Sequence, residues 1–79
     1  MTIDHLRNLV LAGSVLDVVV KPTEGGYHLW ADTLQGLHAI ETVRGARRTW
    51  RQLDTVERNL TECGIAQWRF EAPEAQAGM

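Results

Sequence analysis

The strongest constraint on the fold is a pair of valine-rich and aromatic-rich runs separated by two glycines. Residues 14–21 read SVLDVVVK and residues 27–32 read YHLWAD, and side chains of these kinds fit a pleated, half-buried surface. Between the runs, Pro22 has no N–H to donate to a β-ladder, and Gly25 and Gly26 adopt positive φ readily. We therefore expect two strands joined by a hairpin turn, with the first strand ending before Pro22.

The period of two along a strand assigns each side chain to a face. In the first strand, Asp17 and Lys21 mark the wetter face, and the opposite face carries Leu16, Val18 and Val20. In the second strand, two sets alternate in the same way: Tyr27, Leu29 and Ala31 against His28, Trp30 and Asp32.

Three further segments have strand character. We expect residues 37–43 (LHAIETV) to form a third strand and residues 47–51 (RRTWR) a short fourth strand, joined by a turn centred on Gly45. Residues 66–71 (AQWRFE) are expected to form the final strand, with three inward side chains: Ala66, Trp68 and Phe70.

Residues 2–13 show the helical period instead. Ile3, Leu6, Leu9 and Val10 recur at helical spacing, so this segment is expected to form a short helix. Thr2 is suited to cap its N-terminus, and Gly13 can adopt the left-handed conformation that ends a helix.

Residues 52–64 predict a second helix. Asp54 and Glu57 have the spacing of a capping box, and Gly64 supplies a C-terminal stop. One apolar stripe runs along this helix, formed by Leu53, Val56, Leu60 and Cys63.

The order of these elements, α-β-β-β-β-α-β, predicts an α+β fold. We expect a two-layer sandwich in which an antiparallel meander sheet is covered on one face by a helix. A chain of 79 residues is expected to hold one domain, here residues 1–71, followed by a disordered C-terminal tail over residues 72–79, which contain little to bury. A domain of this size buries a modest fraction of its surface and needs a compact core, a partner or a staple to be stable.

The single cysteine, Cys63, excludes an intramolecular disulfide and a cysteine-rich zinc site. A lone thiol fits a reducing compartment. The first residues lack the basic leader and apolar run of a signal peptide, and the longest apolar runs fall far short of the ~20 residues that span a bilayer. We therefore expect a cytoplasmic protein without membrane association.

The inventory of reactive side chains is short. His5, His28 and His38 are the only histidines, and a metal site would need His28 and His38 to meet and to recruit carboxylates. Cys63 belongs to an apolar stripe near a helix C-terminus, whose partial negative charge disfavours a thiolate. Ser14 is the only serine, and no glycine loop has phosphate-binding spacing. We expect no enzymatic activity, no cofactor and no metal.

Three tryptophans are many for a chain of this length. Trp68 is expected in the core. For Trp30 and Trp50 two assignments stay open, because aromatic rings fill gaps in small cores, while exposed rings beside arginine are typical of protein interfaces and single-strand stacking platforms.

A cluster of arginines precedes the second helix, at Arg44, Arg47, Arg48 and Arg51. The whole chain has a net charge of −2 and a pI of about 5.8, unlike a dedicated non-specific DNA binder. If Trp50 points toward the helix, Arg48 lies on that side, while Arg47 and Arg51 line the open face. The cluster is either a solvated edge that blocks aggregation or a basic patch for nucleic acid or an acidic partner.

Residues 41–71, ETVRGARRTWRQLDTVERNLTECGIAQWRFE, resemble small ParC-like partition-associated accessory proteins of bacterial plasmids and integrative elements. The family's order of strand, RGxxR-like turn, aromatic residue, helix and short strand is carried here by Arg44, Gly45, Arg47, Arg48, Trp50, Leu53, Asp54, Leu60, Gly64 and Ile65. The chain departs from the pattern at Gln52, where a capping serine would be natural, and at Glu62 and Cys63, which replace a more apolar ending. The resemblance implies a plasmid-maintenance or mobile-element context, without a defined biochemical activity.

These features favour a non-enzymatic protein-interaction module, a homodimeric accessory protein that uses a sheet face or edge to bind itself or an unidentified protein partner. The alternative is a weak nucleic-acid-binding accessory protein that uses the arginine cluster at residues 44–51. The candidate binding residues are Arg44, Arg47, Arg48, Arg51, Trp50 and Trp30.

Overall fold

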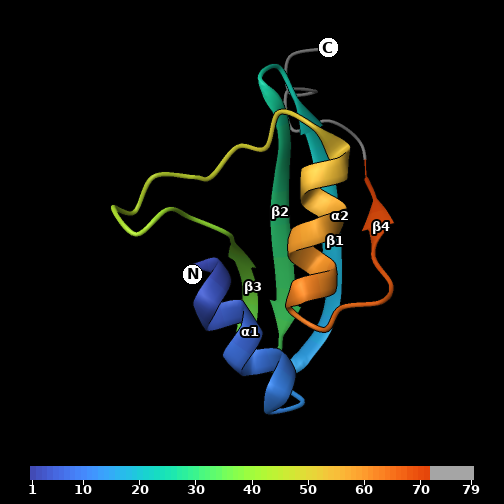
Figure 1. The fold of residues 1–79 in the computed structure, drawn as a ribbon. Coiled ribbons are helices and arrows are strands. Elements are labelled where there is room, and N and C mark those ends of the chain that lie inside the picture. Colours follow the sequence, from blue (N-terminus) through green and yellow to red (C-terminus); the bar gives the residue numbers. More distant parts are fainter. Residues whose placement is uncertain (72–79) are drawn as a thin grey trace.

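The computed structural model describes residues 1–71; the tail predicted to be disordered, residues 72–79, lies outside the described residues. The elements follow in the order α1 (Ile3–Leu11), β1 (Val15–Thr23), β2 (Gly26–Thr33), β3 (Gly36–Ala39), α2 (Leu53–Glu62) and β4 (Arg69–Phe70). The strands form one sheet in the order β3-β2-β1-β4, and both helices lie on the same face of it (Figure 1). The predicted α+β class is confirmed, but the observed order is α-β-β-β-α-β, with one strand fewer before α2.

The predicted hairpin forms, but the expectation that Pro22 ends its first strand is wrong. β1 continues to Thr23, and Pro22 pairs with Tyr27. The N–H of Glu71 donates to the carbonyl of Val20, so the backbone groups of Val20, and of Pro22 two residues later, point away from β2. The missing N–H of Pro22 therefore falls on the outer edge of β1, where the ladder with β2 does not need it.

The prediction that Leu16 shares the buried face of Val18 and Val20 is wrong, because β1 contains a β-bulge. The register of β1 against β2 shifts between Val15 and Asp17, which makes Leu16 the extra residue of the bulge. Alternation restarts after it, so Val18 and Val20 are buried as expected, while Leu16 is 62% exposed.

The third and fourth predicted strands both lie along the same edge of β2, and a loop separates them. β3 is shorter than the predicted strand over 37–43, and residues 47–51 form no strand of their own. Continuing the β2–β3 register would set residue 42 opposite Tyr27, but Tyr27 is bridged by Trp50, eight residues later. The Trp50 N–H donates to the Tyr27 carbonyl at 2.9 Å, and the Tyr27 N–H donates to the Trp50 carbonyl at 2.7 Å. The intervening residues leave the sheet as a loop.

The last strand also differs from its prediction. β4 contains two residues and runs parallel to β1, so the sheet is mixed and is not an antiparallel meander. α2 returns the chain to the end of the sheet where β1 begins, so the next strand runs in the same direction as β1 (Figure 1). Neither helix covers this edge. Of the three side chains predicted to point inward, only Trp68 packs against the core, whereas Ala66 and Phe70 are exposed.

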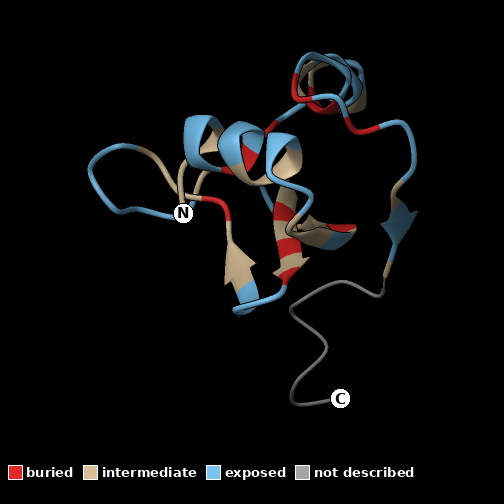
Figure 2. Cartoon of the chain, turned by 90° about the horizontal axis from the view of Figure 1, so that it is seen from below, coloured by how far each residue is buried: buried red, intermediate tan, exposed pale blue. Residues whose placement is uncertain are grey.

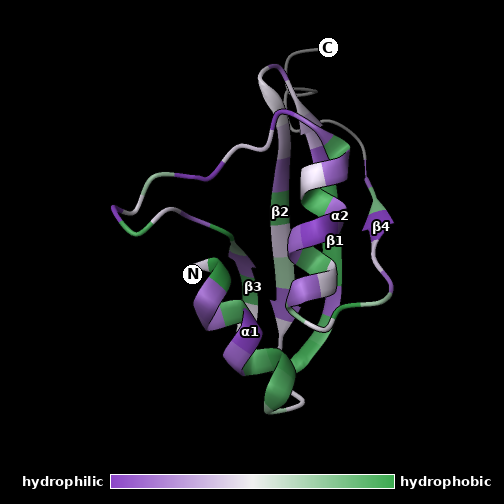
Figure 3. Cartoon of the chain, viewed as in Figure 1, coloured by the Kyte–Doolittle hydropathy of each residue, from purple (hydrophilic) through white to green (hydrophobic). Residues whose placement is uncertain are grey.

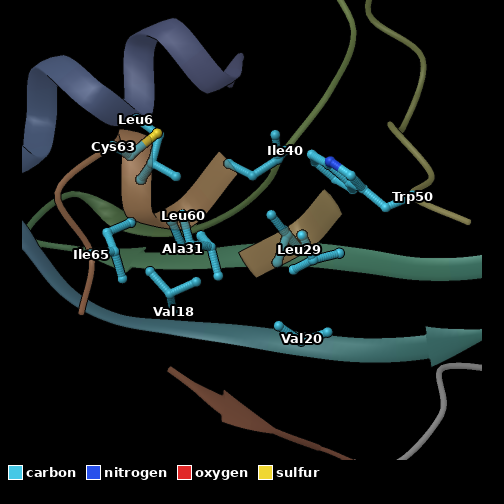
Figure 4. Close-up of a cluster of buried hydrophobic side chains, with 11 residues drawn as sticks. Leu6, Val18, Val20, Leu29, Ala31, Ile40, Trp50, Leu60, Cys63 and Ile65 are labelled. Atoms are coloured by element: carbon cyan, nitrogen blue, oxygen red, sulfur yellow. The ribbon is translucent and has the colours of Figure 1, made fainter. Parts of the chain in front are cut away.

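The core fills the space between the helices and the sheet, as the buried segments in Figure 2 show. The predicted stripe of α2 is confirmed, because Val56, Leu60 and Cys63 are buried and Leu53 packs beside them. The buried cluster, of which Figure 4 gives a close-up, consists of Leu6, Val18, Val20, Leu29, Ala31, Ile40, Trp50, Val56, Leu60, Cys63 and Ile65.

The helix ends agree with the sequence in part. The Thr2 hydroxyl accepts a hydrogen bond from the N–H of His5 at 3.2 Å, so the predicted cap of α1 is confirmed. The predicted capping box of α2 is wrong, because Gln52 occupies the N-cap position and its side chain makes no capping hydrogen bond. Gly64 ends α2 at a φ of 85°, and the Ile65 N–H bonds to the Leu60 carbonyl at 2.9 Å.

Candidate functional site

The segment before α2 sends alternate side chains to opposite faces of the sheet. Trp50 points into the core, is 3% exposed, and lies beneath Arg48, whose Cζ is 4.7 Å from the ring centroid. Arg47 and Thr49 face the other way. Of the two assignments open for Trp50, core and interface, burial supports the core, and Arg48 lies on the helix side as expected.

Arg47 meets Trp30 on the open face, which we define as the sheet face that carries no helix. Its Cζ is 4.7 Å from the Trp30 ring centroid, and Lys21 Nζ is 5.0 Å from the same ring, so two cations interact with one π-system. Two residues away along each chain segment, on the same face, Thr49 Oγ1 lies 3.1 Å from His28 Nε2. Residues from two distant parts of the chain thus converge over β2.

A hollow of about 190 Å³ lies beside Trp30 on the open face. Its lining mixes charged and apolar side chains, and Val19, at its floor, is almost fully buried although no helix covers it. The lining residues are Val19, Lys21, Trp30, Asp32, Leu37, Arg69 and Glu71.

Ion pairs close the β1–β4 side of this hollow. Arg69 Nε donates to Asp17 Oδ2 at 2.6 Å, Arg69 also pairs with Glu71, and Lys21 Nζ lies 3.8 Å from Glu71. Hydrogen bonds to Asp17 and then to Glu71 raise the pKa of the Arg69 guanidinium. The charges on this side of the open face are therefore largely paired.

Backbone groups beside β1 and just beyond β3 are already hydrogen-bonded at two positions. On the β1 edge, Asp17 Oδ1 accepts from the N–H of Val18 at 2.9 Å. On the β3 edge, the N–H of Glu41 donates to the Met1 carbonyl at 2.6 Å, and the Met1 amine lies 3.0 Å from Glu41 Oε1. Groups used in this way are not offered to an incoming strand, which makes strand addition a poor binding mode for these positions.

The residues looped out of the β2 edge form what we call the basic loop, residues 41–48. The loop closes on itself: the Thr42 N–H donates to the Ala46 carbonyl at 2.7 Å, and Gly45, at a φ of 90°, donates its N–H to the Thr42 carbonyl at 2.9 Å. All residues from Val43 to Arg47 are exposed, Val43 to 91%. Within residues 1–71, no carboxylate forms an ion pair with Arg44.

A second surface was not singled out by the sequence. Four exposed leucines lie at one end of the molecule, where α1 and β2 end and β1 and β3 begin, and the Leu34 N–H donates to the Ser14 carbonyl at 3.0 Å across this end. In Figure 3 the end of α1 and the start of β1 are coloured as hydrophobic there. We call this set the apolar end: Leu11 (80% exposed), Leu16 (62%), Leu34 (68%) and Leu37 (55%). The sequence signal that could have indicated this surface is Leu34, an apolar residue in the turn between β2 and β3.

Beside Leu16 the surface is hollowed by about 200 Å³. The hollow lies between the end of α1, the start of β1 and the segment after α2. Its lining is Val10, Val15, Leu16, Asp17, Val18, Gly64, Ile65 and Gln67.

The residues considered for catalysis or metal binding do not converge. His28 lies on the open face, whereas His38 pairs with Ala31, whose side chain is buried on the helix-covered face. Cys63 is buried, and burial raises the pKa of its thiol. In the described part of the chain, no three His, Cys, Asp or Glu side chains are grouped closely enough to hold a metal ion.

No family model matches this chain, and neither a curated protein nor a solved structure is similar to it. Among residues 1–71, neither helix has the length and apolar character needed to cross a bilayer.

Proposed function

We propose that the protein is a non-enzymatic interaction module that forms a homodimer through its apolar end. The observation behind the proposal is that four leucines, each more than half exposed, lie at the same end of a small domain. Exposed apolar patches of this kind mark protein contacts, because burying them removes apolar area from water.

A second copy of the same chain fits this surface. A two-fold interface brings the same patch from both copies together, so the patch must be complementary to itself. The apolar end has both parts that this requires: Leu16 projects from the bulge, and the hollow beside it is lined by Val10, Val15 and Ile65. In the dimer, Leu16 of each copy enters the hollow of the other.

The small core gives an energetic reason for dimer formation. A domain of this length has little apolar area to bury on its own, and association adds to it. The hydrogen-bonded positions at the sheet edges favour packing through side chains over strand addition. The resemblance of residues 41–71 to partition-associated accessory proteins supports a role in plasmid or mobile-element maintenance, where such a dimer would act as an accessory protein in the cytoplasm.

Sedimentation velocity over a wide range of protein concentration tests the proposal. We expect a monomer–dimer equilibrium, and we expect Leu16→Lys and Leu34→Lys each to raise the dimer dissociation constant roughly tenfold or more. Val43→Lys is the matched control, because Val43 is more exposed than either leucine but lies in the basic loop. A wild-type chain that stays monomeric at the highest concentration, or equal effects of all three substitutions, would contradict the proposal.

A further inference from the structure

We propose that the basic loop is a nucleic-acid contact that binds the phosphate backbone through Arg44 and Arg47. This site is separate from the apolar end, since it lies on the connection between β3 and α2. The proposed contact includes only part of the arginine cluster. Arg48 faces the core side of the sheet and is not part of the contact.

The fold does not account for the loop. Trp50 takes the place opposite Tyr27 that continued pairing would give to residue 42, so the edge of β2 would be paired equally well without the eight intervening residues. The residues from Val43 to Arg47 are all exposed and add no side chain to the core. An ordered, projecting loop that buries nothing is a common place for binding residues.

The loop has internal order that suits a binding element. Its own backbone hydrogen bonds hold the turn at Thr42–Ala46, and the Arg48 N–H donates to the Ile40 carbonyl at 3.1 Å at its base. The contact of Arg47 with Trp30 holds one side of the loop against the open face. A loop ordered before binding loses less conformational entropy when it binds.

The charges around the loop favour an anion. Arg47 lies against Trp30 beside Lys21, which is itself paired with Glu71, and Arg44 is near the loop tip without a carboxylate partner in residues 1–71. Among residues 1–71, two acidic groups near the loop are already engaged: Glu41 with the Met1 amine, and Glu71 with Arg69 and Lys21. Asp32 is a further carboxylate of the described residues on that side, in the lining of the hollow beside Trp30.

The chemistry favours phosphate over a stacked base. A guanidinium presents its N–H donors in a fork that matches phosphate oxygens. The Trp30 ring is already in contact with two cations, so we do not assign it a base-stacking role. Contacts to phosphate alone carry no sequence information, so binding is expected to be weak, sequence-independent and strongly dependent on salt.

Fluorescence anisotropy of labelled duplex and single-stranded DNA, titrated with the full chain, tests this inference. We expect binding at about 20 mM salt that weakens steeply toward about 200 mM, with a log–log slope near −0.9 per phosphate contact on the duplex. Arg44→Ala should weaken binding roughly three- to tenfold and lower the slope by about 1. Arg58→Ala is the matched control, because it removes the same charge from an exposed position on α2.

Three outcomes would overturn the inference. One is the absence of binding to either DNA at low salt. Another is an equal loss in the Arg44 and Arg58 variants, which would mean that net charge alone is responsible. The third is capture of labelled poly-glutamate more tightly than DNA, which would assign the loop to an acidic protein partner. Circular dichroism of both variants verifies that the fold is intact.

Discussion

Trp30 and Trp50 each lie beneath an arginine whose Cζ is 4.7 Å from the ring centroid, but they occupy opposite faces of the sheet. Trp50 is buried among the helix-facing core residues, and its indole N–H has no hydrogen-bond acceptor in the described part of the chain. Trp30 stands half-buried on the open face, beside charged residues of β1 and the basic loop.

The Trp50 side of the sheet contributes to stability, whereas the Trp30 side presents surface charges. Both arginines come from adjacent positions, Arg47 and Arg48, and the period of two in an extended segment is enough to send them to opposite faces. The same local contact therefore stabilises the core on one side and positions a surface cation on the other. Substitutions at the paired positions should have unequal effects.

The largest effect is expected for Trp50→Ala, which should lower the free energy of unfolding by about 3–5 kcal/mol because it leaves a large cavity. Trp30→Ala, on the half-exposed face, should cost about 1 kcal/mol. Urea denaturation followed by far-UV circular dichroism measures both.

Trp50→Phe tests whether the cost of Trp50→Ala comes from the lost ring volume. It keeps most of the buried ring and removes the buried N–H that has no acceptor, so it should cost much less than Trp50→Ala. Equal losses for the two alanine variants at positions 30 and 50 would contradict the assignment of the two faces.

The next effect is expected for Gly26→Ala, because a Cβ at this position would lie 2.1 Å from the Trp50 carbonyl oxygen, at a φ of 142°. Backbone displacement there should cost about 2–3 kcal/mol. Gly45→Ala is the control: its φ is also positive, at 90°, but a Cβ would meet open space, so the cost should be about 1 kcal/mol. A larger loss at Gly45 than at Gly26 would show that the edge contact of Trp50 is not tight.

The free energy of unfolding should depend on pH through Cys63, which is buried on the helix-covered side of the sheet. Burial raises the pKa of the Cys63 thiol above its ordinary value of 9.0, so the folded state keeps the proton that the unfolded state loses. Stability from this group is complete below pH 9 and falls as pH rises through the pKa of the folded state. Cys63→Ala should remove that part of the decline. Denaturation midpoints measured between neutral pH and pH 10 test it, and identical curves for the two proteins would contradict it.

The smallest effects are expected at the arginines themselves. Arg48→Ala should lower the free energy of unfolding by about 1 kcal/mol, because the guanidinium covers a buried ring, and Arg47→Ala by about 0.5 kcal/mol. Lysine at position 48 should recover part of the loss, since it keeps the cation but lacks the planar guanidinium. Double-mutant cycles with Trp50→Phe and Trp30→Phe measure each coupling.

The sequence predicted those elements whose pattern repeats over many residues. The valine-rich β1, the alternating β2 and the apolar stripe of α2 all appear where the periodicity places them. The alternation of Arg47, Arg48 and Trp50 was also readable, because it depends only on an extended backbone and not on strand pairing.

The misassignments within the sheet share a cause: each depends on a partner that lies elsewhere along the chain. Leu16 follows the pattern of a core residue, but a register shift against β2 turns it outward. Residues 47–51 have strand composition, yet in the described part of the chain they join the β2 edge through a single bridge, from Trp50 to Tyr27. Of the candidate binding residues, Trp50 was left open by the sequence and placed in the core by the structure.

By itself, the sequence determined the hairpin, the two amphipathic segments and the alternation of side chains along β2 and from Arg47 to Trp50, because these follow from local periodicity and turn chemistry. Only the tertiary structure decided that the final strand is parallel to β1, that eight residues leave the β2 edge as a basic loop, and that four leucines lie at one end. Such features arise when segments distant in the chain compete for one sheet edge or one helix-covered surface, and no local pattern encodes the outcome of that competition.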